Sequence, residues 1–161
     1  MEIRELQIED IPKIWKINFE CWRKNYKWII DDVFLNGITI ERWIEKAKIY
    51  YNKPEVFALV KEIEWEIIWF IDGHANNEKE FEINRLYVDP IKQWEWHGKE
   101  LFMTFINNKN IKKYPNIMLF TLKDNPQSRW FYEKLGWTLW IETKKAWWEK
   151  EYPIVEYRRE R

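Results

Sequence analysis

The stretch RLYVDPIKQWEWHGKELF, residues 85–102, joins a strand pattern to a helix pattern. Four apolar residues recur at helical spacing after the turn: Leu101, Phe102, Phe105 and Ile106. A helix N-terminus exposes unpaired N–H groups and a partial positive charge, which favour a diphosphate. Gly98 is small enough to let such a ligand approach. Trp94 and Trp96 are not, so each indole either points away from the ligand or fills its place.

The rest of the chain alternates between strand and helix patterns. Period-two apolar residues and turn signals predict strands at residues 2–7, 55–63, 66–75, 80–88, 117–122, 137–148 and 151–160. Apolar spacing predicts helices at residues 8–26, 39–52, after Gly98, and at 125–135. Residues 107–116 are rich in helix breakers and are expected to form a loop. The order is β-α-α-β-β-β-α-β-α-β-β, in one domain spanning residues 1–161.

Composition excludes several classes of protein. The chain has 161 residues, enough to bury a core, and carries 27 Lys plus Arg against 27 Asp plus Glu. This balance argues against a nucleic-acid-binding protein and against a polybasic membrane anchor. The charged N-terminus lacks the apolar region of a signal peptide, and no apolar run reaches membrane-helix length. The single cysteine allows no internal disulfide, so we expect a cytoplasmic protein.

Two motifs resemble the GCN5-related N-acetyltransferase (GNAT) family. The first, LYVDPIKQWEWHGKEL, is similar to the family's central strand–turn–helix motif, with Gln93, Trp96 and Gly98 at its three marked positions. The second, NPQSRWFYEKLGW (residues 125–137), is similar to the family's later signature. Two motifs in the right order indicate the family more strongly than either alone. The resemblance implies an α/β (α+β) fold with a mixed central sheet of about seven strands and four helices.

The resemblance also implies a reaction and a set of residues. In this family an amine attacks the thioester of acetyl-CoA directly, and a thiolate leaves. Tyr132 would then be the acid that protonates the leaving sulfur, and Glu82 the base, acting through water. Acetyl-CoA would be held by backbone groups of the first motif and by two residues of the second: Leu86, Tyr87, Val88, Gln93, Trp94, Glu95, Trp96, His97, Gly98, Lys99, Asn125 and Ser128. The acceptor would be a primary amine of a small molecule or peptide.

The chain departs from the family pattern where it carries tryptophan. Trp28, Trp65, Trp69 and Trp96 stand at or near positions where the family often has glycine or another small residue. An alternative interpretation follows, a non-catalytic or engineered protein with the same fold whose diphosphate turn is blocked by Trp94 and Trp96. Reverting Trp96 to glycine separates the two interpretations.

Other polar residues carry simpler interpretations. Tyr132 could be an aromatic core residue, and Glu82 the solvent-facing member of a strand. His97 is expected to offer backbone contact or lie in solvent, and Cys21 to be packed rather than reactive. Two isolated histidines and one cysteine do not form a metal site, so no metal is expected. The sequence leaves the amine acceptor open, and a homodimer is compatible with the resemblance.

Overall fold

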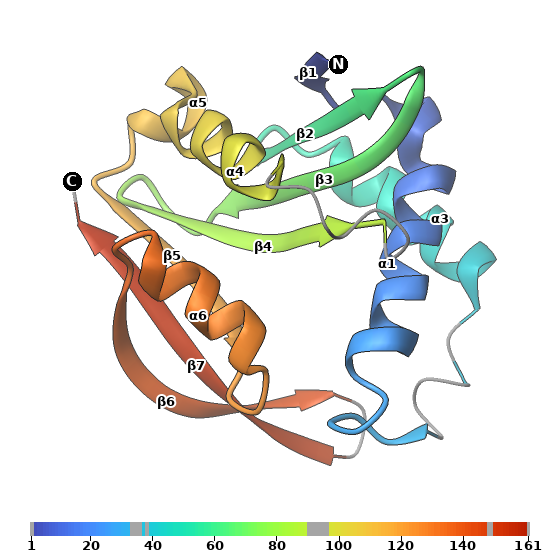
Figure 1. Ribbon diagram of the computed structural model, residues 1–161. Helices are drawn as coiled ribbons and strands as arrows, with labels where there is room; N and C mark the ends of the chain where they lie inside the picture. The colour runs from blue at the N-terminus through green and yellow to red at the C-terminus, as the bar shows by residue number, and fades with distance from the viewer. Residues whose placement is uncertain (1, 33–36, 38, 90–96, 148–149, 161) are drawn as a thin grey trace.

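The structure is a computed structural model that describes residues 2–32, 37, 39–89, 97–147 and 150–160 (Figure 1). Its strands are β1 (Glu2–Glu5), β2 (Val56–Ile63), β3 (Glu66–Ala75), β4 (Glu80–Val88), β5 (Asn116–Leu122), β6 (Thr138–Trp147) and β7 (Lys150–Glu160). Its helices are the 3₁₀ turn η1 (Ile8–Asp10), α1 (Ile11–Asn25), α3 (Ile40–Tyr51), α4 (His97–Asn107), α5 (Lys109–Lys112) and α6 (Pro126–Lys134). The predicted order of elements is confirmed. The segment expected to be a loop, residues 107–116, contains the short helix α5, which Asn108 caps by accepting a hydrogen bond from the Asn110 N–H.

The strands form one mixed sheet of seven, in the order β1-β2-β3-β4-β5-β7-β6, which confirms the predicted sheet. All neighbours are antiparallel except β4 and β5, which run parallel. Their pairing begins at Glu80 with Asn116 and ends at Ile83 with Leu119, although β4 continues to Val88 and β5 to Leu122. Figure 1 shows the two strands separating toward α1. The sheet therefore splits in the middle. Beyond the paired residues, the only described strand that pairs with β4 is β3, and the only one that pairs with β5 is β7.

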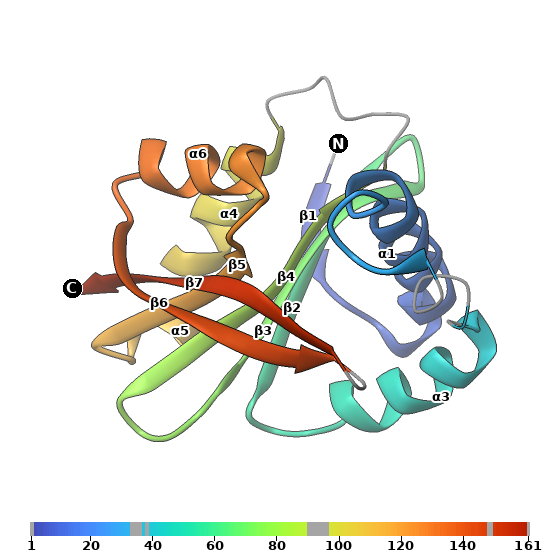
Figure 2. The same ribbon diagram turned by 90° about the horizontal axis from the view of Figure 1, so that it is seen from below.

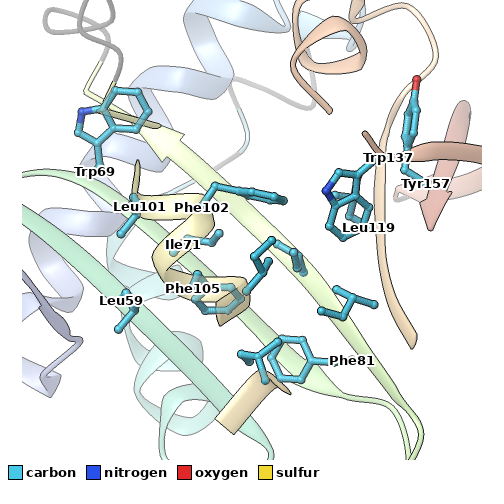
Figure 3. Close-up of a cluster of buried hydrophobic side chains, with 14 of the residues drawn as sticks. Leu59, Trp69, Ile71, Phe81, Leu101, Phe102, Phe105, Leu119, Trp137 and Tyr157 are labelled. Atoms are coloured by element: carbon cyan, nitrogen blue, oxygen red, sulfur yellow. The ribbon is translucent and has the colours of Figure 1, made fainter. Parts of the chain in front are cut away.

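Helices cover both faces of the sheet. Figure 2 shows α1 and α3 on one face and α4, α5 and α6 on the other. The four apolar residues of α4 at helical spacing, Leu101, Phe102, Phe105 and Ile106, are all buried as predicted. They pack with residues of β2, β3, β4 and β5 in the larger core cluster (Figure 3). Burying a side chain of this size contributes about 1.5–3 kcal/mol, so this cluster fixes α4 on the sheet.

A β-bulge distorts β4 beside the split. Asp72 of β3 pairs with Arg85, but the next residue, Gly73, pairs with Ile83, so Asn84 has no partner on β3. Gly73 lies against the backbone of β4, where an added Cβ would be 2.3 Å from the Glu82 carbonyl oxygen. Only glycine allows this close approach. The bulge bends β4 and directs both Asn84 and Arg85 toward α3, where they contact Tyr50.

No helix within the described residues is long and apolar enough to cross a membrane. α1, for example, buries six residues along its length but also carries exposed lysines, arginine and proline.

The turn between β2 and β3 places a tryptophan in an unfavourable backbone conformation. Glu64 and Trp65 connect the paired ends Ile63 and Glu66, with φ values of 51° and 68°. Positive φ at both central residues is typical of a type I′ hairpin turn, which prefers Asn-Gly. The Trp65 side chain is 94% exposed, so almost no burial compensates the backbone strain.

We predict that Trp65→Gly stabilises the protein. Glycine adopts positive φ without a Cβ penalty, so the free energy of unfolding should rise by about 1 kcal/mol. A change of that size raises Tm by about 2–4 °C in a domain of this length. Thermal and denaturant unfolding measure both quantities. Trp65→Ala removes the same indole but keeps the Cβ, and it should give no gain. Equal stabilisation by alanine would show that the backbone is not the cause.

Candidate functional site

A cavity of about 650 Å³ opens where β4 and β5 separate. Residues 82–87 of β4 form one wall, and Phe120, Thr121 and Leu122 of β5 form another. α1 and α3 close it on one side, and Ser128 and Tyr132 of α6 reach it on the other. The cavity therefore brings together Glu82, Leu86 and Tyr87 of β4 with Ser128 and Tyr132 of the second motif, about forty residues later in the sequence.

The edge of β4 that borders this cavity offers backbone groups. The Asp89 N–H bonds to the Ile68 carbonyl of β3. Because successive residues of a strand direct their backbone groups to opposite edges, those of Val88 and Leu86 point away from β3, toward the split. The Val88 carbonyl accepts a hydrogen bond from the Cys21 Sγ at 2.8 Å. The remaining groups can bind an extended, amide-bearing ligand as an added strand would.

Cys21 is packed rather than reactive, as predicted. It is 1% exposed, and burial raises the pKa of its thiol to about 12. A thiol with this pKa stays protonated at neutral pH and is a poor nucleophile.

Both ends of α6, the helix of the second motif that carries Tyr132, are capped by hydrogen bonds. At the start of α6, the Asn125 side chain accepts a hydrogen bond from the Ser128 N–H at 3.1 Å. At the end, the Gly136 N–H bonds to the Glu133 carbonyl and the Trp137 N–H bonds to the Tyr132 carbonyl. This is a Schellman motif, and Gly136 supplies the positive φ of 80° that it requires.

The Tyr132 ring is packed among aromatic side chains. Its centroid lies 5.9 Å from Phe102, 5.3 Å from Phe131, 6.5 Å from Trp137 and 6.0 Å from Tyr157. Burial raises the pKa of its hydroxyl above the ordinary value near 10, with a smaller contribution from the charge of Tyr26. The hydroxyl therefore remains a proton donor at physiological pH.

Two further tyrosines, Tyr26 and Tyr87, line the cavity with Tyr132. The Trp22 Nε1–H donates to the Tyr87 hydroxyl at 2.6 Å. The Tyr26 side chain lies near both Tyr87 and Asn125, and burial raises the pKa of the Tyr26 and Tyr87 hydroxyls. The sequence pointed to Tyr87 and Asn125 but not to Tyr26 or Trp22. These two belong to the end of α1, and only the tertiary fold brings them to the second motif.

Glu82 lies on β4 and lines the cavity, on the opposite side of the bulge from Tyr87. It pairs across the sheet with His74 of β3 and with Met118 of β5. The Asn76 side chain donates to its Oε2 at 3.4 Å. Glu82 is half-buried, so part of its side chain is accessible from the cavity.

A buried ion pair lies behind the bulge. Asp72 is fully buried, and its Oδ2 is 2.8 Å from the Arg85 Nε. Burial alone would lower the pKa of Arg85, but the Asp72 carboxylate together with Tyr51 and Tyr50 raises the pKa above its ordinary value. The guanidinium also lies over the rings of Trp15, Tyr50 and Tyr51. This cluster fixes the wall that α3 and β4 present to the cavity.

Part of the first motif lies outside the described residues. Gln93, Trp94, Glu95 and Trp96 belong to that part, and so does the His97 side chain. The structure places the start of α4 at His97, followed by buried Gly98 and exposed Lys99. The N–H groups of this first turn have no acceptor within the helix, so they can bind an anion.

Gly98 is required for a reason that the sequence did not reveal. A Cβ at this position would lie 2.3 Å from Cζ3 of the Trp69 ring, so the indole occupies the space beside the glycine. Figure 3 shows Trp69 at the edge of the core, beyond Leu101. The small residue lets the helix pack on an indole. Its N–H remains part of the first turn.

Solved structures of N-acetyltransferases match the chain over nearly its whole length. PaiA N-acetyltransferase from Thermoplasma acidophilum, solved with coenzyme A, matches with a TM-score of 0.75 and 22% identity, covering 96% of each chain. Spermidine N-acetyltransferase from Vibrio cholerae, solved with CoA and spermine, gives 0.77 and 14% identity, covering 99% of this chain and 94% of the other. The chain has the GNAT fold. No protein-family model matches the sequence, and no curated protein does.

The ribosomal-protein-alanine N-acetyltransferase from Brucella melitensis has the same fold, with a TM-score of 0.74 and 15% identity over 99% of both chains. Within the GNAT fold, the described residues fit a coenzyme with a diphosphate and an amide-bearing arm. The open edge of β4 suits the arm, and the first turn of α4 suits the diphosphate. No group of three or more metal-ligating side chains occurs among the residues that the structure describes.

We predict that Gly98→Ala destabilises the protein through Trp69. Alanine is normally favoured over glycine in a helix, but here its Cβ overlaps the indole, and overpacking of this kind costs about 1–3 kcal/mol. Chemical denaturation measures the loss. In a Trp69→Leu background the same substitution should cost much less, because the ring is gone. Thr104→Ala, at an exposed position of α4, is the matched control and should not destabilise. An equal cost of Gly98→Ala in both backgrounds would exclude Trp69 as the cause.

Proposed function

We propose that the protein transfers an acetyl group from acetyl-CoA to a primary amine of a small molecule or peptide. The observation that carries the proposal is the cavity at the split between β4 and β5, which has a tyrosine hydroxyl on one side and a carboxylate on the other. Bound acetyl-CoA supplies an activated thioester. The residues of the chain position the two reactants and move protons between them.

The backbone of β4 binds the acyl end of the coenzyme. Leu86 and Val88 direct their backbone groups to the open edge, where they hydrogen-bond the pantetheine arm and orient the thioester carbonyl. Asn125 and Ser128 border the same path, and Gly98 and Lys99 present N–H groups to the diphosphate. Gln93, Trp94, Glu95, Trp96 and His97 complete the proposed turn.

Glu82 and Tyr132 move the protons. The acceptor amine must lose a proton as its nitrogen bonds to the acyl carbon, and Glu82 accepts that proton through a water molecule. The carbon–sulfur bond breaks, and the sulfur takes a proton from the Tyr132 hydroxyl. Burial keeps that hydroxyl protonated, as a general acid requires. The products are an N-acetyl amide and CoA.

We predict that acetyl-CoA stabilises the protein. A ligand that binds only the folded state at 100 times its Kd adds about 2.7 kcal/mol to the free energy of unfolding. Thermal unfolding with and without the ligand detects this as a rise in Tm. The absence of any shift at millimolar acetyl-CoA would contradict the proposal. A shift that appears only in Trp96→Gly would support the alternative, in which the tryptophans block the turn.

We predict that Tyr132→Phe lowers kcat by about 10²–10⁴-fold, the usual contribution of a general acid. The ring packing is kept, so Tm should change little. CoA release from acetyl-CoA, followed by thiol detection, measures the rate. Because the raised pKa keeps the hydroxyl protonated, the wild-type rate should show no alkaline decline up to about pH 10. Tyr114→Phe, which removes a hydroxyl outside the cavity, is the control. Full activity of Tyr132→Phe would exclude its role as the acid.

A further inference from the structure

The described lining of the cavity has an unequal distribution of charge. It contains four cationic side chains, Arg42, Lys46, Arg85 and Lys145, and one carboxylate, Glu82. Asp72 neutralises Arg85. The other three cations form no ion pair with a described carboxylate within 4 Å, so three positive charges face one negative charge.

These three cations lie at the solvent edge of the cavity. Arg42, Lys46 and Lys145 are exposed residues that also line it. Arg42 and Lys46 come from α3, and Lys145 comes from β6, on the other side of the split. The Lys46 ammonium lies 5.3 Å from the centroid of the Trp43 ring, and that of Lys145 lies 6.0 Å from the Phe120 ring. Positively charged side chains therefore lie on both walls of the cavity, near its opening.

The arrangement on α3 is unfavourable for the helix itself. Arg42 and Lys46 are four residues apart, so their side chains are neighbours on the helix surface and repel each other. Trp43 stacks on Trp15 with 5.3 Å between ring centroids. The Arg85 guanidinium in turn makes a cation–π contact with the Trp15 ring. This packing fixes the face of α3 that holds the two cations. An anion bound between them would relieve their repulsion.

We propose that the acceptor is a primary amine that also carries an anionic group, which Arg42 and Lys46 bind at the cavity rim. This rests on the proposed function, since it assigns the amine end to Glu82 and the anionic end to α3. Lys145 adds to the attraction from the opposite wall. The aromatic side chains between rim and sheet, including Trp15, Trp22 and Trp43, provide an apolar wall for the body of the acceptor.

A polyamine suits this cavity poorly. Each of its ammonium groups would enter a region that already holds three cations, and like charges at close range disfavour binding. Glu82, the one carboxylate in the described lining, is already assigned to the reacting amine. The Vibrio cholerae enzyme was solved with spermine, so the two chains would share a fold but differ in acceptor.

Three amines of equal length test the charge preference. Hexylamine, 6-aminohexanoate and 1,6-diaminohexane present the same reacting amine, with a methyl, a carboxylate or a second ammonium at the far end. We expect kcat/KM to be at least tenfold higher for 6-aminohexanoate than for 1,6-diaminohexane, with hexylamine between them. The difference should lie mainly in KM and should shrink as salt is added.

Charge reversal on α3 ties the preference to the two residues. Arg42→Glu with Lys46→Glu should reverse the order of 6-aminohexanoate and 1,6-diaminohexane. Lys48→Glu with Lys53→Glu makes the same change in net charge at positions that do not line the cavity, and it should leave the order unchanged. A wild-type preference for the diamine, or an order unaffected by the reversal at Arg42 and Lys46, would overturn the inference.

Binding separates this inference from the proposed function. If the protein neither binds acetyl-CoA nor releases CoA with any amine, the proposed function fails. Titration calorimetry with the same three compounds then decides the charge preference without turnover. Tighter binding of 6-aminohexanoate, lost on reversal of Arg42 and Lys46, supports the inference. Equal binding of the three compounds, or tighter binding of the diamine, overturns it.

Discussion

The split sheet depends on the shortness of one strand pairing. β4 and β5 pair over only four residues each, from Glu80 with Asn116 to Ile83 with Leu119. Beyond this point each strand is held by its other neighbour, β3 or β7, and has one open edge. An unpaired backbone group that is buried is costly, so an open edge inside a fold must face water, a side chain or a ligand. Cys21 satisfies the Val88 carbonyl, and the remaining groups border the cavity. The structure thus supplies a ready template for an extended ligand.

The bulge at Asn84 completes this arrangement. A regular strand would place Asn84 and Arg85 on opposite faces, but the extra residue turns both toward α3. Arg85 can then pair with Asp72 below Trp15, and Asn84 can bond to the Tyr50 hydroxyl at 2.6 Å. Glu82 lies before the bulge and Tyr87 after it. One inserted residue and the glycine beside it, Gly73, therefore set the geometry of the wall that β4 and α3 present to the cavity.

Local sequence patterns predict the helices and strands, whereas contacts between distant parts of the chain determine which residues line the cavity. Helical spacing identified the buried face of α4 and the extent of α6 to within a residue at each end, because such signals act over a few residues. Tyr26, Trp22 and Arg42 carry no local signal for their positions at the cavity. The bulge was equally invisible, since it depends on how β3 and β4 approach each other. Gly98 was singled out as the small residue that admits a diphosphate, whereas the contact that the structure shows there comes from Trp69, twenty-nine residues earlier.

In the part of the chain that the structure describes, the buried tryptophans fill space in the core but leave their indole N–H groups without hydrogen-bond partners. Among the described residues, the buried indole N–H groups of Trp15, Trp69 and Trp137 have no hydrogen-bond acceptor. Leaving a buried donor unsatisfied costs about 1–3 kcal/mol, which offsets part of the gain from burying each ring. Trp69 illustrates the balance, because its ring fills the space below Gly98 and its nitrogen is unpaired. The indole therefore supports the first turn of α4 by shape alone. A contact of this kind occupies none of the N–H groups of the first turn, so they stay available for an anion.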